Sequence, residues 1–384
     1  MFPPMQTGTS FYSKNVAEAL IARKHRVTVI TLENLAAKNE IHSFDIHRMP
    51  ALSFPLKNYF KHLKISSLFP QNYAKVNRVA RETEADVILL VNHYLDIAFP
   101  AIFAARKNQI PLICSVGTQL QSSNPKRDRI LNIMDKLICG RLIFPFCDRI
   151  ISWDTQILKY LCDIHGPRIA EKSVTINYGV NGDISTFTGH TQRYKLHNQI
   201  LGVGAVSEQR NFLSIIQAFK LVSQEFPDLR LKIIGHIYYD AAVKMAGALG
   251  IRERVIFTGE LSHAEVLKEL GNSDLYYSSL SGKYLGLGTA TIESMLMGLP
   301  TMANVPADLL GLALLEDMRH IAFVDAASPE QIAEKIRVLL KHEGLRQKIG
   351  HEGRQFILTH MRWDNVAEKM ENLFVSLINS TVTP

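Results

Sequence analysis

The sequence predicts an α/β protein of two domains, each built on a doubly wound parallel sheet, and three observations support this fold class. The chain has 384 residues, too many for one compact α/β unit and enough for two of roughly 150 to 200 residues each. Short, apolar, β-branched runs alternate with amphipathic helical stretches. A polar stretch from about Gly182 to Asn198 interrupts this alternation, and we place the boundary between domains 1–182 and 199–360 there.

The first domain begins with a predicted helix at Ser10–Arg23, where Phe11, Val16 and Leu20 have helical spacing, and continues into a strand at Val27–Thr31. Further strands are predicted at 86–91, 111–116, 149–152 and 174–177. Enough chain separates them for crossover connections, so the strands are expected to be parallel. Residues 1–9, with two prolines and a glycine, have a loop composition where such a domain normally starts with a buried strand. We therefore expect a first strand to be missing from this sequence.

The second domain shows a clearer alternation of strands and helices. Strands are predicted at 199–203, 231–235, 255–259, 274–277, 300–303 and 321–324, with helices near 212–226, 238–249, 263–271 and 329–341. In doubly wound sheets the carboxyl ends of the strands, and the glycines that follow them, border the ligand crevice. Two facing sheets would place that crevice in a cleft between the domains.

The most informative segment is Leu285–Pro300, where a glycine-rich turn runs into a helix that ends at Gly298 and Pro300. The free amides and partial positive charge of a helix amino terminus suit a diphosphate. Glu293 lies about one turn into the helix, where its carboxylate can accept two hydrogen bonds from ribose hydroxyls. The alternative is that Gly286 and Gly288 only shape a loop and that Glu293 is a solvated helix residue.

Composition narrows the class of protein. With 47% hydrophobic and 21% charged residues and no uninterrupted apolar run of about 18 residues, the chain is typical of a soluble globular protein without a transmembrane helix. It also lacks a secretory or transit pattern at its amino end. The cysteines, at positions 114, 139, 147 and 162, lack metal-ligand spacing and are expected to be buried free thiols in a reducing cytoplasmic compartment.

These motifs, in their order and spacing, resemble the retaining GT-B glycosyltransferases of the family-four type. In that family the pattern E-G-F-G-x4-E-A-M-x2-G-x-P stands where this chain has Leu285–Pro300. The resemblance extends along nearly the whole chain. The other matching segments are Pro3-Pro4 with Gly8-Thr9, the strand at 25–31, Asn177–Asn181, Gly204–Asn211, Thr258–Leu261 and Arg362–Val366. The last begins a helix, 361–384, that crosses back to the first domain in the family.

The chain departs from the family pattern at three places. Leu285 replaces a glutamate that contacts the transferred sugar, and Ala205 replaces an arginine, which leaves Arg210 as the cation of the diphosphate loop. Gly117 stands where a histidine often follows the strand. His93, at the end of the preceding strand, is a candidate substitute in the cleft, although a lone histidine at a strand end is more often structural.

The resemblance implies a nucleotide-sugar donor and transfer with retention, in which the departing phosphate helps to deprotonate an acceptor hydroxyl. The expected catalytic residues are Glu293, Arg210 and His93. The expected donor-binding residues are Gly8, Thr9, Gly204, Arg210, Leu261, Gly286, Gly288, Thr289, Ala290 and Glu293. The sequence shows no DxD pair after a strand, so neither a metal nor another cofactor is expected, and amides and Arg210 would stabilise the leaving group.

The distribution of charged residues suggests an acceptor at a membrane surface. The net charge is +7 with a pI near 9.1, and no acidic residue occurs between Asp45 and Glu82. Basic residues alternate with apolar ones over 48–81, as in an element lying on an anionic membrane surface; an ordinary solvated lysine face is the alternative. Another acid-free stretch runs from Ile97 to Arg127. No nucleic-acid recognition motif is present.

Two functions from different classes stay open. One is an enzyme that glycosylates a lipid-linked or glycan acceptor of the cell envelope at the inner face of the cytoplasmic membrane. The other is a catalytically weak GT-B protein that binds nucleotide sugar as a partner of another transferase. Leu285 and Ala205 are the residues that keep the second function open.

Overall fold

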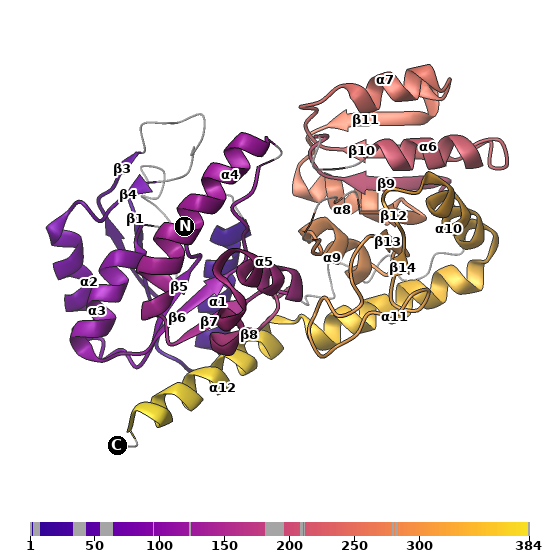
Figure 1. Ribbon diagram of the computed structural model, residues 1–384. Helices are drawn as coiled ribbons and strands as arrows, with labels where there is room; N and C mark the ends of the chain where they lie inside the picture. Colours follow the sequence, from indigo (N-terminus) through magenta and orange to yellow (C-terminus); the bar gives the residue numbers. More distant parts are fainter. Residues whose placement is uncertain are drawn as a thin grey trace. The chain divides into compact units, whose positions relative to one another are not determined.

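The structure is a computed structural model that describes residues 2, 8–33, 44–53, 64–94, 96–122, 124–180, 196–207, 210, 212–278, 280, 283 and 285–382. The chain divides into two compact units (Figure 1). Unit 1 comprises Met1–Gly179 and Trp363–Pro384, and unit 2 comprises Val180–Arg362. Most of the predicted boundary segment 182–198 lies outside the described residues, as do Pro3 and Pro4.

Unit 1 contains two separate parallel sheets. Strand β1 (Thr28–Leu32) pairs with β2 (Asp45–Met49), and a second sheet has the order β5 (Ile88–Val91), β6 (Leu112–Val116), β7 (Arg149–Ser152) and β8 (Ser173–Thr175). A short antiparallel pair joins β3 (Leu52–Ser53) to β4 (Lys64–Ile65). The strand predicted at 149–152 has those bounds, and the other predicted strands of this domain differ by one or two residues at an end.

Helices cover the sheets of unit 1 (Figure 1). They are α1 (Gly8–Ala22), α2 (Pro70–Glu82), α3 (Ala98–Asn108), α4 (Pro125–Met134), the π-helix η1 (Asp135–Ile143), α5 (Thr155–His165) and α12 (Trp363–Val382), with short 3₁₀ turns at Phe144–Phe146 and Pro167–Lys172. α12 packs against α1 in a buried cluster that contains Tyr12 and Trp363. Trp153 lies half-buried beside Tyr12, with the ring centroids 4.1 Å apart. Unit 1 therefore holds both tryptophans of the chain.

Unit 2 is built on one six-stranded parallel sheet. Its order is β11 (Val255–Gly259), β10 (Arg230–Ile234), β9 (Gln199–Val203), β12 (Leu275–Tyr277), β13 (Thr301–Ala303) and β14 (Ala322–Phe323). The helices are α6 (Phe212–Val222), α7 (Ala241–Ala248), α8 (His263–Gly271), α9 (Thr289–Leu296), α10 (Pro329–Lys341) and α11 (Glu343–His360), with a 3₁₀ turn at Arg252–Arg254. The strands predicted at 199–203 and 255–259 and the helices predicted at 263–271 and 329–341 have those bounds. The predicted α/β class with parallel sheets is confirmed.

Two further predictions concern the chain as a whole. All four cysteines are free, with Cys114, Cys139 and Cys147 buried and Cys162 half-buried, which confirms the expected free thiols. Within the described residues, no helix combines the length and the apolar character that a membrane span requires.

Candidate functional site

The strand order of unit 2 reverses between two neighbouring strands, β9 and β12. From β9 the chain proceeds to β10 and β11 on one side of the sheet, and β12 then begins the other side. Loops diverge at such a switch point and leave a crevice at the carboxyl ends of the strands. Two residues in these loops, Arg210 after β9 and Leu280 after β12, form an isolated antiparallel bridge. A ligand crevice is therefore expected between these two loops.

Glycines hold the loops after β9 and β10 close together. Gly204 has φ +145° and Gly235 has φ +146°. A Cβ on Gly235 would lie 2.1 Å from the Gly204 carbonyl oxygen, and one on Gly204 would lie 2.5 Å from Arg210 Nη1. The collision at Gly235 is with the backbone, so glycine is needed there for the close approach; at Gly204 the positive φ favours glycine, and a side chain would displace the Arg210 guanidinium.

Arg210 lies beside this loop, and none of the described carboxylates forms an ion pair with it. Its Nη1 donates to the Val203 carbonyl at 3.4 Å, and burial lowers its pKa from 12.5. An arginine still keeps its charge at neutral pH. The side chain can therefore neutralise an anion at the crevice.

Helix α9 begins at the same edge of the sheet. Gly288 is its N-cap and supplies no side-chain cap, while the Thr291 and Ile292 amides bond to the Gly288 carbonyl. Thr291 Oγ1 donates to Ser278 Oγ at 3.2 Å, which ties the first turn of α9 to the end of β12. The amides of Thr289 and Ala290 precede this turn, at the end of the helix that attracts anions.

The glycines before α9 leave space at the surface. Gly288 has φ −71°, which any residue can adopt, and a Cβ there would make only ordinary contacts of 3.8 Å or more. The backbone conformation at Gly288 therefore does not require glycine. Gly286 is half-buried in the same turn. At Gly298, φ of +68° ends the helix in the left-handed region that favours glycine.

Glu293 is paired with a histidine that sequence reasoning did not find. His263 Nε2 lies 2.8 Å from Glu293 Oε1, and the side chains are 68% and 15% exposed. Burial raises the pKa of Glu293 above 4.5, while His263 acts in the opposite direction. His263 is the first residue of α8 and follows the N-cap Ser262, which forms a capping box with Glu265. The Ser262–Glu265 spacing is a local sequence signal that indicates a helix start at His263, just after Leu261.

Apolar residues border the other side of the site. Leu261, Ala290 and Val203 are partly buried and pack against one cluster that includes Tyr276. Tyr276 is fully enclosed, and burial raises its pKa to about 12. The structure of unit 2 thus brings together predicted residues from the loops after β9 and β11 and from α9.

The predicted residues of unit 1 lie at the carboxyl ends of β5 and β6. Gly8 is the exposed first residue of α1, and the buried Thr9 accepts a hydrogen bond from Asn92 Nδ2 at 2.6 Å. A Cβ on Gly117 would lie only 1.9 Å from the Trp153 ring. The indole therefore fills the space at the position where the related family often has a histidine.

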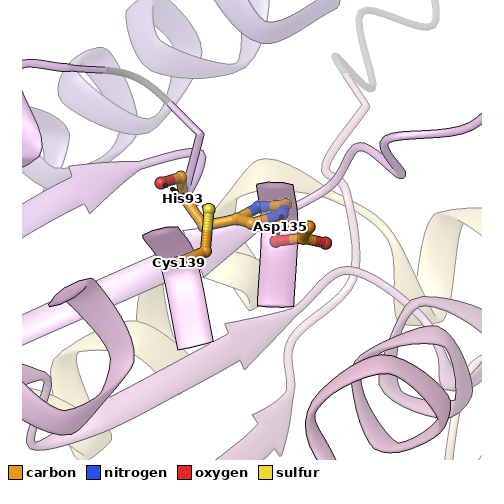
Figure 2. A group of neighbouring side chains, drawn as sticks. All are labelled: His93, Asp135 and Cys139. Carbon is orange, nitrogen blue, oxygen red and sulfur yellow. Dashed lines mark hydrogen bonds and ion pairs between the residues drawn. The ribbon is translucent and has the colours of Figure 1, made fainter. Parts of the chain in front are cut away.

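His93 lies in the interior of unit 1 (Figure 2). Its side chain is 0% exposed, with Nε2 3.3 Å from Asp135 Oδ1, and His165 Nε2 lies 3.5 Å from the same oxygen. The Cys139 thiol donates to the His93 carbonyl at 3.6 Å. A side chain without exposed surface cannot contact a substrate in this conformation, so we leave His93 out of the proposed site.

The ligand atoms of His93, Asp135 and Cys139 lie within 4.8 Å of one another, a spacing at which a metal could bind. However, the Tyr160 hydroxyl donates to Asp135 Oδ2. Burial and Asp135 also raise the pKa of Cys139, so the thiol keeps its proton. We therefore describe the group as a buried polar network.

Two family descriptions match the chain in succession. Glycosyltransferase Family 4 matches residues 7–183, and Glycosyl transferases group 1 matches residues 186–356. An uncharacterized glycosyltransferase of Haemophilus influenzae is 25% identical over 300 residues, which are 77% of this chain and 76% of the relative. The phosphatidyl-myo-inositol mannosyltransferase of Mycobacterium tuberculosis is 21% identical over 380 residues, 97% of this chain and 94% of the relative.

Solved structures share the fold. Anabaena Alr3699/HepE, in complex with UDP and glucose, has a TM-score of 0.67 at 15% identity, and the match covers 98% of each chain. The two units correspond to the two Rossmann-like domains of this architecture. From the successive family matches and the shared fold, the chain belongs to the group 1, family-four glycosyltransferases with the GT-B fold.

Proposed function

We propose that the protein transfers a sugar from a nucleoside diphosphate donor to an acceptor hydroxyl, with retention of configuration and without a metal. The observation that carries this proposal is the grouping in unit 2 of the cation Arg210, the amino end of α9 and the carboxylate of Glu293. These groups suit a nucleoside diphosphate. A cation and backbone amides bind its phosphates, and a carboxylate accepts hydrogen bonds from its ribose hydroxyls.

Each group would have a separate role. The Thr289 and Ala290 amides and Arg210 would hold the diphosphate and stabilise the charge that develops on it as the sugar departs. Glu293 would accept hydrogen bonds from the ribose, and Leu261 would pack against the base. The departing phosphate would take the proton of the acceptor hydroxyl on the same face of the sugar, so no protein nucleophile is required.

A catalytically weak protein that binds the donor for another transferase is the alternative. Leu285 favours it, because this half-buried apolar residue stands where the family has a sugar-contacting glutamate. Arg210 and Glu293 serve donor binding in both cases. Only turnover separates the two functions.

The test is a panel of UDP-, GDP- and ADP-sugars offered to the purified protein, with donor binding and donor hydrolysis measured separately. We expect one donor to bind and to be hydrolysed slowly, with turnover unchanged by EDTA and an NMR spectrum of the first-formed sugar that shows the donor's anomeric configuration. Binding without any turnover would support the partner protein instead. Inversion, or loss of activity with EDTA, would contradict the retaining or the metal-free mechanism.

We also propose that the acceptor is carried by a membrane lipid, as the name of the mycobacterial relative states for that protein. The sequence predicts that residues 48–81 lie on an anionic membrane surface. Residues 54–63 of this segment lie outside the described residues. Within the rest, Lys64 and Lys75 donate to backbone carbonyls, and Val76 and Val79 are buried. Leu52 and Leu68 are 54% and 67% exposed, and Arg78 and Arg81 are exposed as well, so the segment also offers basic and apolar surface.

A second candidate surface lies on α4 and η1. Apolar side chains that are 45–57% exposed, Ile130, Ile133, Leu137 and Leu142, occur together with the exposed cations Lys126, Arg129, Lys136 and Arg141. Of the acidic residues of these helices, Asp135 is buried, and the half-buried Asp128 accepts hydrogen bonds from the Ser122 amide and Asn132 Nδ2. A helix face with this mixture suits an anionic lipid surface.

Replacing Ile133 and Leu137 together by glutamate is expected to abolish binding to vesicles that contain anionic phospholipid, because each change removes apolar contact and adds repulsion. Sedimentation with vesicles measures the effect. Leu312→Glu, at a fully exposed leucine of unit 2, is the matched control and should sediment like the unchanged protein. Equal sedimentation of the double variant would exclude α4 and η1 as the membrane surface.

A further inference from the structure

The loop after β10, residues 236–240, exposes several apolar and aromatic side chains in succession. Its sequence is His-Ile-Tyr-Tyr-Asp, and all five residues are exposed. Tyr238 is 73% exposed, and Ile237 and Tyr239 are 37% and 39% exposed. Single exposed apolar residues are ordinary, whereas neighbouring ones mark sites of interaction. The loop is therefore a candidate ligand contact of unit 2.

Backbone hydrogen bonds fix the start of this loop to the loops on both sides of it. On the β11 side, Gly235 N donates to Gly259 O at 2.8 Å. On the β9 side, Val206 N donates to His236 O at 2.8 Å, and Tyr238 N donates to Val206 O at 3.0 Å. The side chains of His236 and Tyr238 are thus attached to an ordered backbone.

The pairing with Val206 determines the direction of these side chains. Val206 and Ile237 form a parallel bridge, so their side chains share one face of the sheet. Val206 is 2% exposed and lies in a core cluster with residues of α6 and α7. Successive side chains of an extended chain point to opposite faces. His236 and Tyr238 therefore both point to the other face, which agrees with the 4.4 Å between their ring centroids.

That other face of the sheet carries the proposed donor site. Ile200 and its neighbour Leu201 in β9 belong to the clusters of the two faces, and Leu261 packs against the cluster that contains Leu201. Residues of α8 belong to the same cluster, and Glu293 of α9 pairs with the first residue of α8. The two aromatic rings therefore point to the side of the sheet where the proposed base and ribose contacts lie.

The sheet order places the loop along the donor as well. Strand β10 lies between β11 and β9. Leu261, the proposed base contact, follows β11, and Arg210, the proposed diphosphate contact, follows β9. The loop after β10 thus starts between the positions proposed for the two ends of a nucleoside diphosphate. Aromatic side chains stack on nucleobases, because every base has a π-face.

From these features we infer that His236 and Tyr238 form an aromatic platform for the base of the donor, in which the Tyr238 ring stacks on the base and the His236 ring supports it. This inference rests on the proposed donor site and adds residues that recognise the nucleoside. Stacking does not read the hydrogen-bonding groups of a base. The platform therefore adds affinity for any base and leaves the choice between bases to other contacts.

The test uses UDP, GDP and ADP as probes of the 384-residue protein. Isothermal titration measures their affinity, and NMR measures the shift of the base proton nearest the glycosidic bond, which a stacked ring moves upfield. Tyr238→Ala removes the ring, and Tyr238→Phe keeps it without the hydroxyl. Tyr239→Ala is the matched control, because this neighbouring tyrosine interacts with Lys244 of α7, a helix of the opposite face.

Tyr238→Ala is expected to weaken the binding of each nucleoside diphosphate that the unchanged protein binds by about tenfold and to abolish the upfield shift of the base proton. Tyr238→Phe should keep both the affinity and the shift, because phenylalanine presents the same π-face. Tyr239→Ala should behave like the unchanged protein. A purely structural role of Tyr238 would not change the shift of a proton on the ligand.

Equal affinity and an unchanged proton shift in Tyr238→Ala would overturn the platform and leave the donor site at Arg210 and Glu293 intact. An equal loss of affinity in Tyr238→Phe and Tyr238→Ala would assign the contact to the hydroxyl and would overturn stacking as well. If the unchanged protein binds none of the three nucleoside diphosphates, the proposed donor site itself is wrong, and the platform falls with it.

Discussion

Replacing Arg210 by alanine is expected to weaken nucleotide-sugar binding by about one to two powers of ten, because a charged hydrogen bond to the diphosphate is worth about 1.5–3 kcal/mol. No described carboxylate pairs with Arg210, so its removal leaves none of the described carboxylates without a partner. Arg210→Lys should have an intermediate effect, since lysine keeps the charge but loses the two-pronged geometry. Isothermal titration with the donor selected from the panel measures the change.

Arg230→Ala is the matched control for this experiment. Arg230 is exposed and begins β10, at the opposite end of the strand from the crevice. Donor affinity should be unchanged in this variant. If Arg210→Ala also binds the donor with unchanged affinity, the diphosphate does not lie against Arg210, and the site at the switch point of unit 2 is wrong.

Glu293→Ala is expected to reduce donor affinity by a similar factor. The pH dependence of donor affinity then tests whether the Glu293 carboxylate is the group that binds the ribose. Burial raises the pKa of Glu293 above 4.5, and His263 opposes that increase. An ionised carboxylate accepts hydrogen bonds from ribose and a protonated one accepts less well, so affinity should fall as the pH decreases through this raised pKa. Glu293→Gln should remove that pH dependence, and His263→Ala should move it to higher pH. An acid limb that persists in Glu293→Gln would assign the titration to another group.

The sheet of unit 2 was predictable because each of its strands is an apolar, β-branched run with a glycine or polar boundary. The strand at 255–259 and the helix at 263–271 have their predicted bounds, because the strand ends at Gly259 and Ser262 caps the helix. In unit 1 the same pattern predicted β7 but did not indicate the π-helix η1. Its residues have the periodicity of an ordinary helix, and the change in hydrogen bonding is not encoded in apolar spacing.

The contacts of the site were less predictable than its residues. Glu293 was recognisable from its place in a glycine-led helix, whereas its partner His263 lies 30 positions earlier in the chain and meets it only through the packing of α8 beside α9. His93 follows a strand, and a residue there can face either a crevice or the interior. Its burial is decided by η1 and α5, which bring Asp135 and His165 against it. No spacing in the sequence relates these three residues.

Removing the carboxylate of Asp135 is expected to lower the free energy of unfolding of unit 1 by about 3 to 5 kcal/mol, the usual cost of breaking a buried charged network. In Asp135→Ala, the rings of His93 and His165 and the hydroxyl of Tyr160 would lose the group that they surround. Urea unfolding followed by tryptophan fluorescence reports on unit 1, which holds both tryptophans. Glu82→Ala is the control, because Glu82 is 66% exposed and its ion pair with Arg78 is 3.9 Å long; we expect a change within about 0.5 kcal/mol.

The pH dependence of this effect follows from the pKa of Asp135. Burial raises that pKa, but the contacts with His165, His93 and Tyr160 lower it by more than burial raises it. The pKa of Asp135 therefore lies below the usual 3.8. A carboxylate whose pKa is lower in the folded than in the unfolded protein stabilises the fold above its unfolded pKa, and this stabilisation is lost as the pH falls through the folded pKa. The difference between the unchanged protein and Asp135→Ala should therefore be full at pH 7 and should shrink below about pH 4. A difference that stays constant down to pH 3 would show that Asp135 acts through its packing and not through its charge.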